Sequence, residues 1–160
     1  MTLADALEAS VLPRAGAVQI DPGAPPTAEL CPLPEALSRV PVAQKSAARW
    51  AYERLILYIR AFEERLDPAQ EVGMGFTGTA AGVLRIEGLG YFDPDIVTFY
   101  GRDEGGVRTQ LVQHVTQLNV VLRAVARVAP AEPPRRIGFR LAADLDAAPP
   151  QPPARGGVPP

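Results

Sequence analysis

The chain offers few side chains that could carry out chemistry, and their numbers exclude several kinds of site. Its single histidine, His114, excludes any metal or catalytic site that needs two imidazoles in one chain. Its single cysteine, Cys31, excludes an intramolecular disulfide bond and a site with two thiolates. Ser46 and the other serines lie outside any nucleophile-elbow pattern. We therefore predict no catalytic residue, no bound cofactor and no metal, and we expect that the protein is not an enzyme.

A glycine motif in the middle of the chain resembles a nucleotide-binding loop. Gly73, Gly75 and Gly78 match G-x-G-x-x-G, with which dinucleotide-binding folds bring backbone amides against a pyrophosphate. Such a site needs a strand directly before the glycines and a helix directly after them. Here a helical pattern that ends at Pro68 precedes the motif, and an alternating strand pattern follows it. We interpret these glycines as closely packed strand backbone.

Acidic residues gather on both sides of one strand-like segment, residues 96–100. Asp93 and Asp95 precede the segment, and Asp103 and Glu104 follow it. The rise of a strand places the two pairs at opposite ends, about 20 Å apart, so they cannot share one cation. We interpret them as residues that form turns.

A stretch without any charged side chain, residues 109–122, indicates a covered surface. Leucine and valine recur there at alternating spacings of four and three, which predicts a helix over residues 109–128. Its opposite side is polar but uncharged, as interface centres are. Another subunit, a protein partner, the first helix or a tail segment could cover it. The predicted interaction surface comprises Gln110, Gln113, His114, Gln117, Trp50 and Leu57.

The one basic cluster of the sequence follows this stretch. A solvated helix end explains it structurally, and a contact to phosphate or RNA explains it functionally. The chain as a whole carries a formal charge of -2, with a pI of about 5.4, so nucleic acid is not the expected partner. The predicted basic patch comprises Arg123, Arg127, Arg135, Arg136 and Arg140.

Proline divides the chain into three parts. Of its 18 prolines, only Pro68 and Pro94 lie within residues 46–129. We predict a disordered N-terminal tail over residues 1–45, a folded domain over residues 46–141 and a disordered proline-rich tail over residues 142–160. The N-terminal tail contains the pattern L-x-[DE]-A-L twice, at residues 3–7 and 33–37. The repeat is either a chance match or a pair of short docking helices.

The remaining elements follow from hydrophobic periodicity. Apolar residues at helical spacing predict a first helix over residues 46–66, with Ser46 as its N-cap. Alternating patterns predict strands near residues 72–76, 83–87, 96–100 and 137–141. With the helix at residues 109–128, the predicted order is α-β-β-β-α-β. We expect an α+β fold in which two helices pack on an antiparallel sheet of about four strands.

Four segments resemble a family of small bacterial proteins of unknown function. They are AYERLILYI, FDPDIVTFYG, QLVQHVTQL and PPRRIGFRL, within residues 50–141. The resemblance supports the limits of the domain and implies no activity, so it assigns no catalytic residue.

No secretory signal begins the chain, and no run of 18 apolar residues could span a bilayer. We therefore expect a cytoplasmic protein that does not bind a membrane. Its expected function is that of a non-enzymatic protein-interaction domain or oligomeric scaffold, with a homo-oligomer or another protein as partner. The alternatives are a nucleic-acid-associated adaptor that uses the basic patch, or a small-molecule-binding enzyme.

Overall fold

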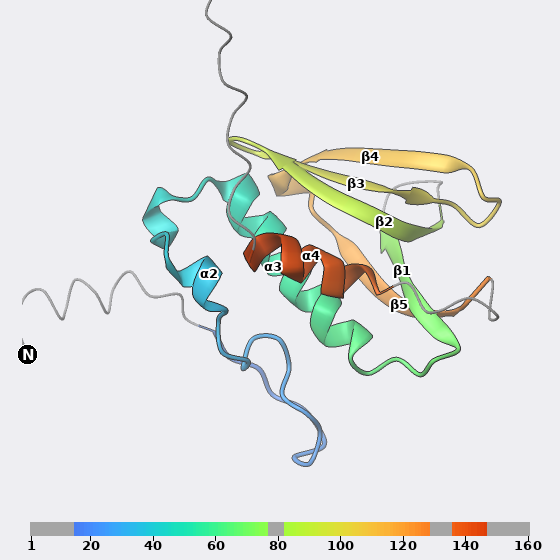
Figure 1. Ribbon diagram of the computed structural model, residues 1–160, viewed down its shortest axis with the longest axis horizontal. Coiled ribbons are helices and arrows are strands. Elements are labelled where there is room, and N and C mark those ends of the chain that lie inside the picture. The colour runs from blue at the N-terminus through green and yellow to red at the C-terminus, as the bar shows by residue number, and fades with distance from the viewer. Residues whose placement is uncertain (1–14, 77–81, 129–135, 147–160) are drawn as a thin grey trace, which may run out of the picture.

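The computed structural model describes residues 15–76, 82–128 and 136–146 and has an α+β fold. An antiparallel sheet of five strands, in the order β4-β3-β2-β1-β5, carries two helices, α3 and α4, on one face (Figure 1). The strands are β1 (Gln70–Phe76), β2 (Val83–Phe92), β3 (Ile96–Arg102), β4 (Arg108–His114) and β5 (Val120–Ala126). The helices are α2 (Glu35–Ser38), α3 (Ala47–Glu63) and α4 (Ile137–Asp146), with short 3-10 turns η1 (Val42–Gln44) and η2 (Val115–Gln117).

The first predicted helix is confirmed as α3. Ser46 caps it as expected, because its side-chain oxygen accepts a hydrogen bond from the Arg49 amide at 3.0 Å. Ile56 and Ile59 on its inner side are completely buried. The helix ends before Pro68, which cannot continue it.

The sheet divides into two arms because β1 and β2 pair over a short distance. Only three residue pairs join these strands, from Gly73↔Arg85 to Gly75↔Val83. Beyond Gly73, β1 continues beside β5 alone, while β2 continues beside β3 as far as Phe92. Figure 1 shows β1 and β5 leaving the direction of β2, β3 and β4, with α3 and α4 lying across the concave side. The core fills the angle between the arms.

Both arms and both helices contribute to one hydrophobic core. Phe76 of β1 and Phe99 of β3 meet edge to face, with ring centroids 4.8 Å apart. The core cluster comprises Ile56, Ile59, Val72, Met74, Phe76, Leu84, Ile86, Val97, Phe99, Leu141 and Ala142. In β1 and β3 these residues alternate with ones on the other face, as a half-covered sheet requires.

The predicted helix over residues 109–128 is wrong, because this segment forms β4, η2 and β5. Within β4 the burial alternates with a period of two: Leu111 lies on the side of the helices and Val112 on the other. The turn η2 shifts the phase between the strands, so Leu111, Leu118 and Leu122 all pack on the core although they lie at spacings of seven and four. Val125, which pairs with Glu71, lies on the other face. The valine-rich run from Val120 favours strand over helix and is the signal that decides the structure.

The predicted strand over residues 137–141 is also wrong, because the segment begins helix α4. Ile137, Leu141 and Leu145 contact the core at a spacing of four, which is helical. Phe139, predicted to share their face, is 55% exposed. The five residues were too few to separate the two periods, and the helical pattern continues into the predicted tail.

The segment before α3 is attached to the helix by a buried ion pair. The side chain of Lys45 is 1% exposed, and its Nζ donates to Glu53 Oε2 and to the Leu37 carbonyl, both at 2.6 Å. Leu37 itself is buried, so the second copy of the leucine repeat packs on this chain. The first copy, at residues 3–7, lies outside the described residues. The predicted limits of the tails stay a prediction.

Helices α3 and α4 touch where a buried carboxylate meets a glycine. Glu63, which is 3% exposed, accepts a hydrogen bond at Oε2 from the Gly138 amide at 2.9 Å. It thereby satisfies one of the free amides at the start of α4. A Cβ on Gly138 would lie 2.7 Å from that oxygen and 2.9 Å from backbone atoms of Arg60. Only glycine allows this contact without a shift of the helices.

Gly138→Ala tests the contact between the helices. Alanine favours a helix interior by about 1 kcal/mol over glycine, yet the overlap with the backbone of Arg60 opposes it. We expect a net loss of about 1–3 kcal/mol in the free energy of unfolding, measured by urea denaturation. Gly16→Ala is the control, since its Cβ would meet nothing within 4 Å. Equal stability of Gly138→Ala and the wild type would contradict the prediction.

The Glu63 carboxyl predicts a pH dependence of stability. Burial raises the pKa of this carboxyl above its ordinary value. The hydrogen bond from the Gly138 amide lowers the pKa, but burial is the larger effect. The folded chain therefore holds this proton to higher pH than the unfolded chain does. The stabilisation is complete below the unfolded pKa and is lost as the pH rises through the folded pKa.

Glu63→Gln keeps an oxygen acceptor and stays neutral at every pH. We expect this variant to gain stability relative to the wild type as the pH rises from about 4 to 7. Urea denaturation across this range measures the difference. Glu64→Gln, at an exposed neighbouring position, should show no such trend. A difference that shrank with pH would refute the assignment.

Candidate functional site

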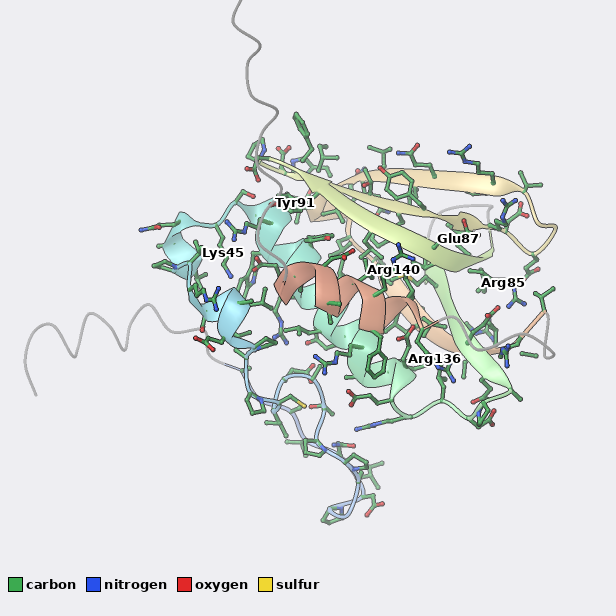
Figure 2. The ribbon with its side chains drawn as sticks, in the orientation of Figure 1. Lys45, Arg85, Glu87, Tyr91, Arg136 and Arg140 are labelled. Atoms are coloured by element: carbon green, nitrogen blue, oxygen red, sulfur yellow. The ribbon has the colours of Figure 1, made fainter. Side chains whose placement is uncertain are left out.

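A cavity of about 550 Å³ opens at the end of the sheet where β1 and β2 separate. We call it the mouth cavity. Figure 2 shows Arg85 and Glu87 at this end of the molecule, away from Tyr91 at the other end of β2. The cavity is lined by Glu71, Val72, Arg85, Ile86, Glu87, Arg102, Asp103, Glu104, Gly105, Gly106, Arg127, Val128 and Ile137. Its volume lies within the range of about 300–1,000 Å³ that is typical of small-molecule sites.

Two arginines of the cavity lie directly opposite each other on adjacent strands. Arg85 of β2 and Arg102 of β3 are partners in the register, so they share the face of the sheet away from the helices. Like charges in this arrangement repel each other. Each is compensated by a carboxylate: Arg85 is paired with Glu71, and Arg102 Nε lies 3.2 Å from Glu87 Oε1.

Backbone carbonyls hold the same two guanidinium groups in place. Arg85 Nη1 donates to the Ala126 carbonyl at 3.1 Å, and Arg102 Nη1 donates to the Gly106 carbonyl at 3.2 Å. Each arginine is therefore fixed between a carboxylate and a carbonyl. This arrangement fixes both positive charges beside the cavity before any ligand arrives.

A bulge in β2 places Glu87 beside Arg102. The register of β2 with β3 shifts between Ile86 and Gly88. Bulges of this kind redirect one side chain. The strands also approach closely here, since a Cβ on Gly101 would lie 2.3 Å from the Arg85 carbonyl oxygen. The ion pair between Arg102 and Glu87 depends on this irregularity.

The β3–β4 turn forms the acidic rim of the cavity. Asp103 Oδ1 accepts hydrogen bonds from the amides of Gly105 and Val107, both at 2.9 Å. Its predicted role in a turn is confirmed, and Asp95 lies at the other end of β3, where it contacts His114. Glu104, next to Asp103, is exposed and lines the cavity.

The predicted polar surface does not form as one face. Gln110 is exposed on β4, whereas Gln113 is 9% exposed and lies on the opposite side of the same strand. These positions would share a helix face at a spacing of three, but a strand separates them. Leu57 is half-buried and lines a small cavity with Ala28 and Cys31, so the N-terminal segment covers it. Trp50 is half-buried as well, with Lys45 Nζ 5.6 Å from its ring centroid.

His114 and Gln117 have local structural contacts that reasoning from the sequence missed. His114 Nδ1 accepts the Thr116 amide at 3.2 Å, so Nε2 carries the proton that faces Asp95 Oδ2 at 2.9 Å. Gln117 Oε1 in turn accepts the His114 amide at 3.2 Å. The two side chains form a capping box around η2.

The predicted basic patch is partly used to hold a loop. Arg127 Nη1 donates to the Pro68 carbonyl at 3.0 Å, and Arg136 Nη1 to the Gln70 carbonyl at 2.7 Å. Both therefore fasten the connection between α3 and β1. Arg123 on β5 and Arg140 on α4 are exposed, and Arg135 lies outside the described residues. Figure 2 shows Arg136 and Arg140 along α4.

Of the charged residues of the mouth cavity, Asp103, Glu104 and Arg127 were singled out from the sequence in other roles, whereas Glu71, Arg85, Glu87 and Arg102 were not. Arg85 and Glu87 appeared only as the polar members of an alternating strand. Arg102, their neighbour in β3, is more than a dozen residues away in the sequence. Only the pairing of β2 with β3 brings it beside them. The motif glycines Gly73 and Gly75 lie inside β1, and Gly78 lies outside the described residues.

Within the described residues, no three His, Cys, Asp or Glu side chains come together in a way that could hold a metal ion. None of the described helices has the length and apolar character needed to cross a membrane.

Comparison with known proteins gives one result. No curated protein and no solved structure matches the chain. A family model, described as a family of unknown function (DUF6173), matches residues 44–140 and confirms the resemblance seen in residues 50–141. Because the match covers more than half of the sequence, the chain belongs to this family of unknown function.

Proposed function

We propose that the protein is a non-enzymatic interaction module that associates with a second copy of itself through the outer edge of β4, which no other described strand covers. The observation that carries this proposal is the nature of that edge. β4 is the outermost strand on its side of the sheet, and its residues 109–113 carry no charge. Monomeric proteins usually protect such edges with charged residues, proline or bulges.

The backbone of β4 has hydrogen-bonding groups directed outward. The Val115 amide donates to the Asp95 carbonyl at 2.8 Å, and the Asp103 amide donates to the Val107 carbonyl at 3.0 Å. Odd-numbered residues therefore face β3, and the alternation of an antiparallel ladder turns the even-numbered ones outward. At His114 this outward amide is bound by Gln117. Those of Gln110 and Val112 face the edge, where a second strand can bind them.

The edge is complementary to itself under a twofold axis. In an antiparallel pair centred on Leu111, Gln110 lies opposite Val112 of the second copy. Arg108 then lies opposite His114, beside which stands the carboxylate of Asp95. A basic end of the strand thus meets an acidic end, and one continuous sheet results. Closed twofold dimers are the commonest symmetric oligomers.

The other edge of the sheet is less suited to this role. β5 carries Arg123 at its centre, and a charge there opposes pairing with another copy of itself. Nor does the alternative of a nucleic-acid adaptor gain support. Two residues of the basic patch, Arg127 and Arg136, are bound to backbone carbonyls of the α3–β1 connection.

Val112→Lys tests the dimer. Val112 is 59% exposed, so a lysine fits in the monomer, but the twofold axis would bring two lysines close together at the edge. We expect the wild type to sediment as a dimer and Val112→Lys as a monomer at about 10–100 µM, a shift in dissociation constant of about tenfold or more. Analytical ultracentrifugation measures both.

Val121→Lys on β5 is the matched control, because Val121 is 47% exposed on the other edge strand. It should leave the dimer intact. Thermal unfolding of both variants checks that the fold is retained. A wild-type monomer throughout this concentration range, or equal dissociation by both variants, would overturn the proposal.

A further inference from the structure

We propose that the mouth cavity binds a small amino-carboxylate, a molecule with a carboxylate and a protonated amine separated by an apolar chain. The cavity lies among β1, β2 and the β3–β4 turn, so this site is separate from the β4 edge. It does not depend on the proposed self-association.

The arginine pair supplies the site for the carboxylate. Arg85 and Arg102 both line the cavity and are opposite partners in the register. Each is bound by a carboxylate and a backbone carbonyl, which hold it in position. Fixed guanidinium groups suit planar carboxylates, since they donate two parallel hydrogen bonds without losing further rotational freedom.

The charge balance of the lining requires a positive group on the same ligand. Three arginines, Arg85, Arg102 and Arg127, face four carboxylates. Glu71 and Glu87 are paired with arginines, and Asp103 is bound by amides of its turn. Glu104 is the acidic group of the rim that forms no such contact with the described residues, so it is the natural partner for an ammonium. A pure anion would add negative charge to this lining, whereas a zwitterion adds none.

Apolar side chains provide a surface for the chain between the two charged groups. Val72 and Ile86 are buried on the core side, and Val128 and Ile137 complete the apolar part of the lining. The separation of β1 and β2 exposes these residues to the cavity beside the charged ones. A few convergent polar groups on an apolar wall are what small-molecule sites generally contain.

Three probes with the same six-carbon chain separate the contributions: 6-aminohexanoate, hexanoate and hexylamine. Titration of the isotopically labelled protein, followed by amide NMR shifts, gives each dissociation constant. We expect 6-aminohexanoate to bind at about 1 mM and both single-charge probes to bind about tenfold more weakly. The shifted amides should belong to residues 85–87 and 102–106.

Variants assign the two ends of the ligand. Arg102→Gln should weaken 6-aminohexanoate and hexanoate about tenfold and leave hexylamine unchanged. Glu104→Gln should weaken 6-aminohexanoate and hexylamine and leave hexanoate unchanged. Arg140→Gln is the control, because Arg140 is an exposed arginine of α4 that does not line the cavity. It should bind all three probes as the wild type does.

Each of three results would overturn the site: no shifted amides at probe concentrations of about 20 mM, shifts confined to other residues, or equal effects of Arg102→Gln and Arg140→Gln. Stronger binding of hexylamine than of 6-aminohexanoate would also reject the carboxylate subsite. The measurement is made at a protein concentration at which the oligomeric state of each variant is known. A failure of dimerisation is thus distinguished from a failure of binding.

Discussion

The three residue pairs between β1 and β2 are the constraint on which the remaining structure depends. If these strands paired along their full length, the five strands would form one continuous sheet and would not divide into two arms. Because they pair only from Gly73↔Arg85 to Gly75↔Val83, the arms separate. Helices α3 and α4 fill the concave side, and the mouth cavity opens where the strands part. Arg85 lies at the last pair, so it belongs to both arms: it pairs with Glu71 of β1 and donates to a carbonyl of β5.

The same geometry explains why the helices meet so closely. The angle between the arms leaves limited space, and α4 fits because Gly138 has no side chain toward α3. Glu63 then lies over the first turn of α4, where the free amides and the helix dipole favour a carboxylate. Burial opposes the charge at the same position and raises its pKa. The contact therefore specifies where α4 begins at some cost in stability near neutral pH.

Local patterns in the sequence predicted α3 and the strands β1 to β3, because these elements have their own caps, breakers and burial periods. They failed where two elements were joined by a short turn: Leu111, Val115 and Leu122 belong to β4, η2 and β5, yet together they have helical spacing. They failed again at Ile137, where five residues cannot distinguish a period of two from one of 3.6. The candidate site could not be predicted from the sequence for a different reason. Arg85 and Arg102 become neighbours only through the register, and the bulge before Gly88 that brings Glu87 to Arg102 leaves no pattern in the sequence.

One inference from the uncharged stretch at residues 109–122 does not depend on whether the stretch is a helix or a strand. Its lack of charge suggested a surface that needs cover, and that argument depends on solvation and not on the backbone conformation. As a helix, the stretch would have offered side chains of Gln110 and Gln113 together. As a strand at the edge of the sheet, it offers the backbone groups of Gln110 and Val112. Backbone pairing with an extended strand is geometrically better defined than a contact with a polar helix face. The change from helix to strand thus makes the proposal more specific. The edge of β4 favours an extended strand as partner, and the symmetry of the proposed pairing about Leu111 makes a second copy of the chain the simplest such partner.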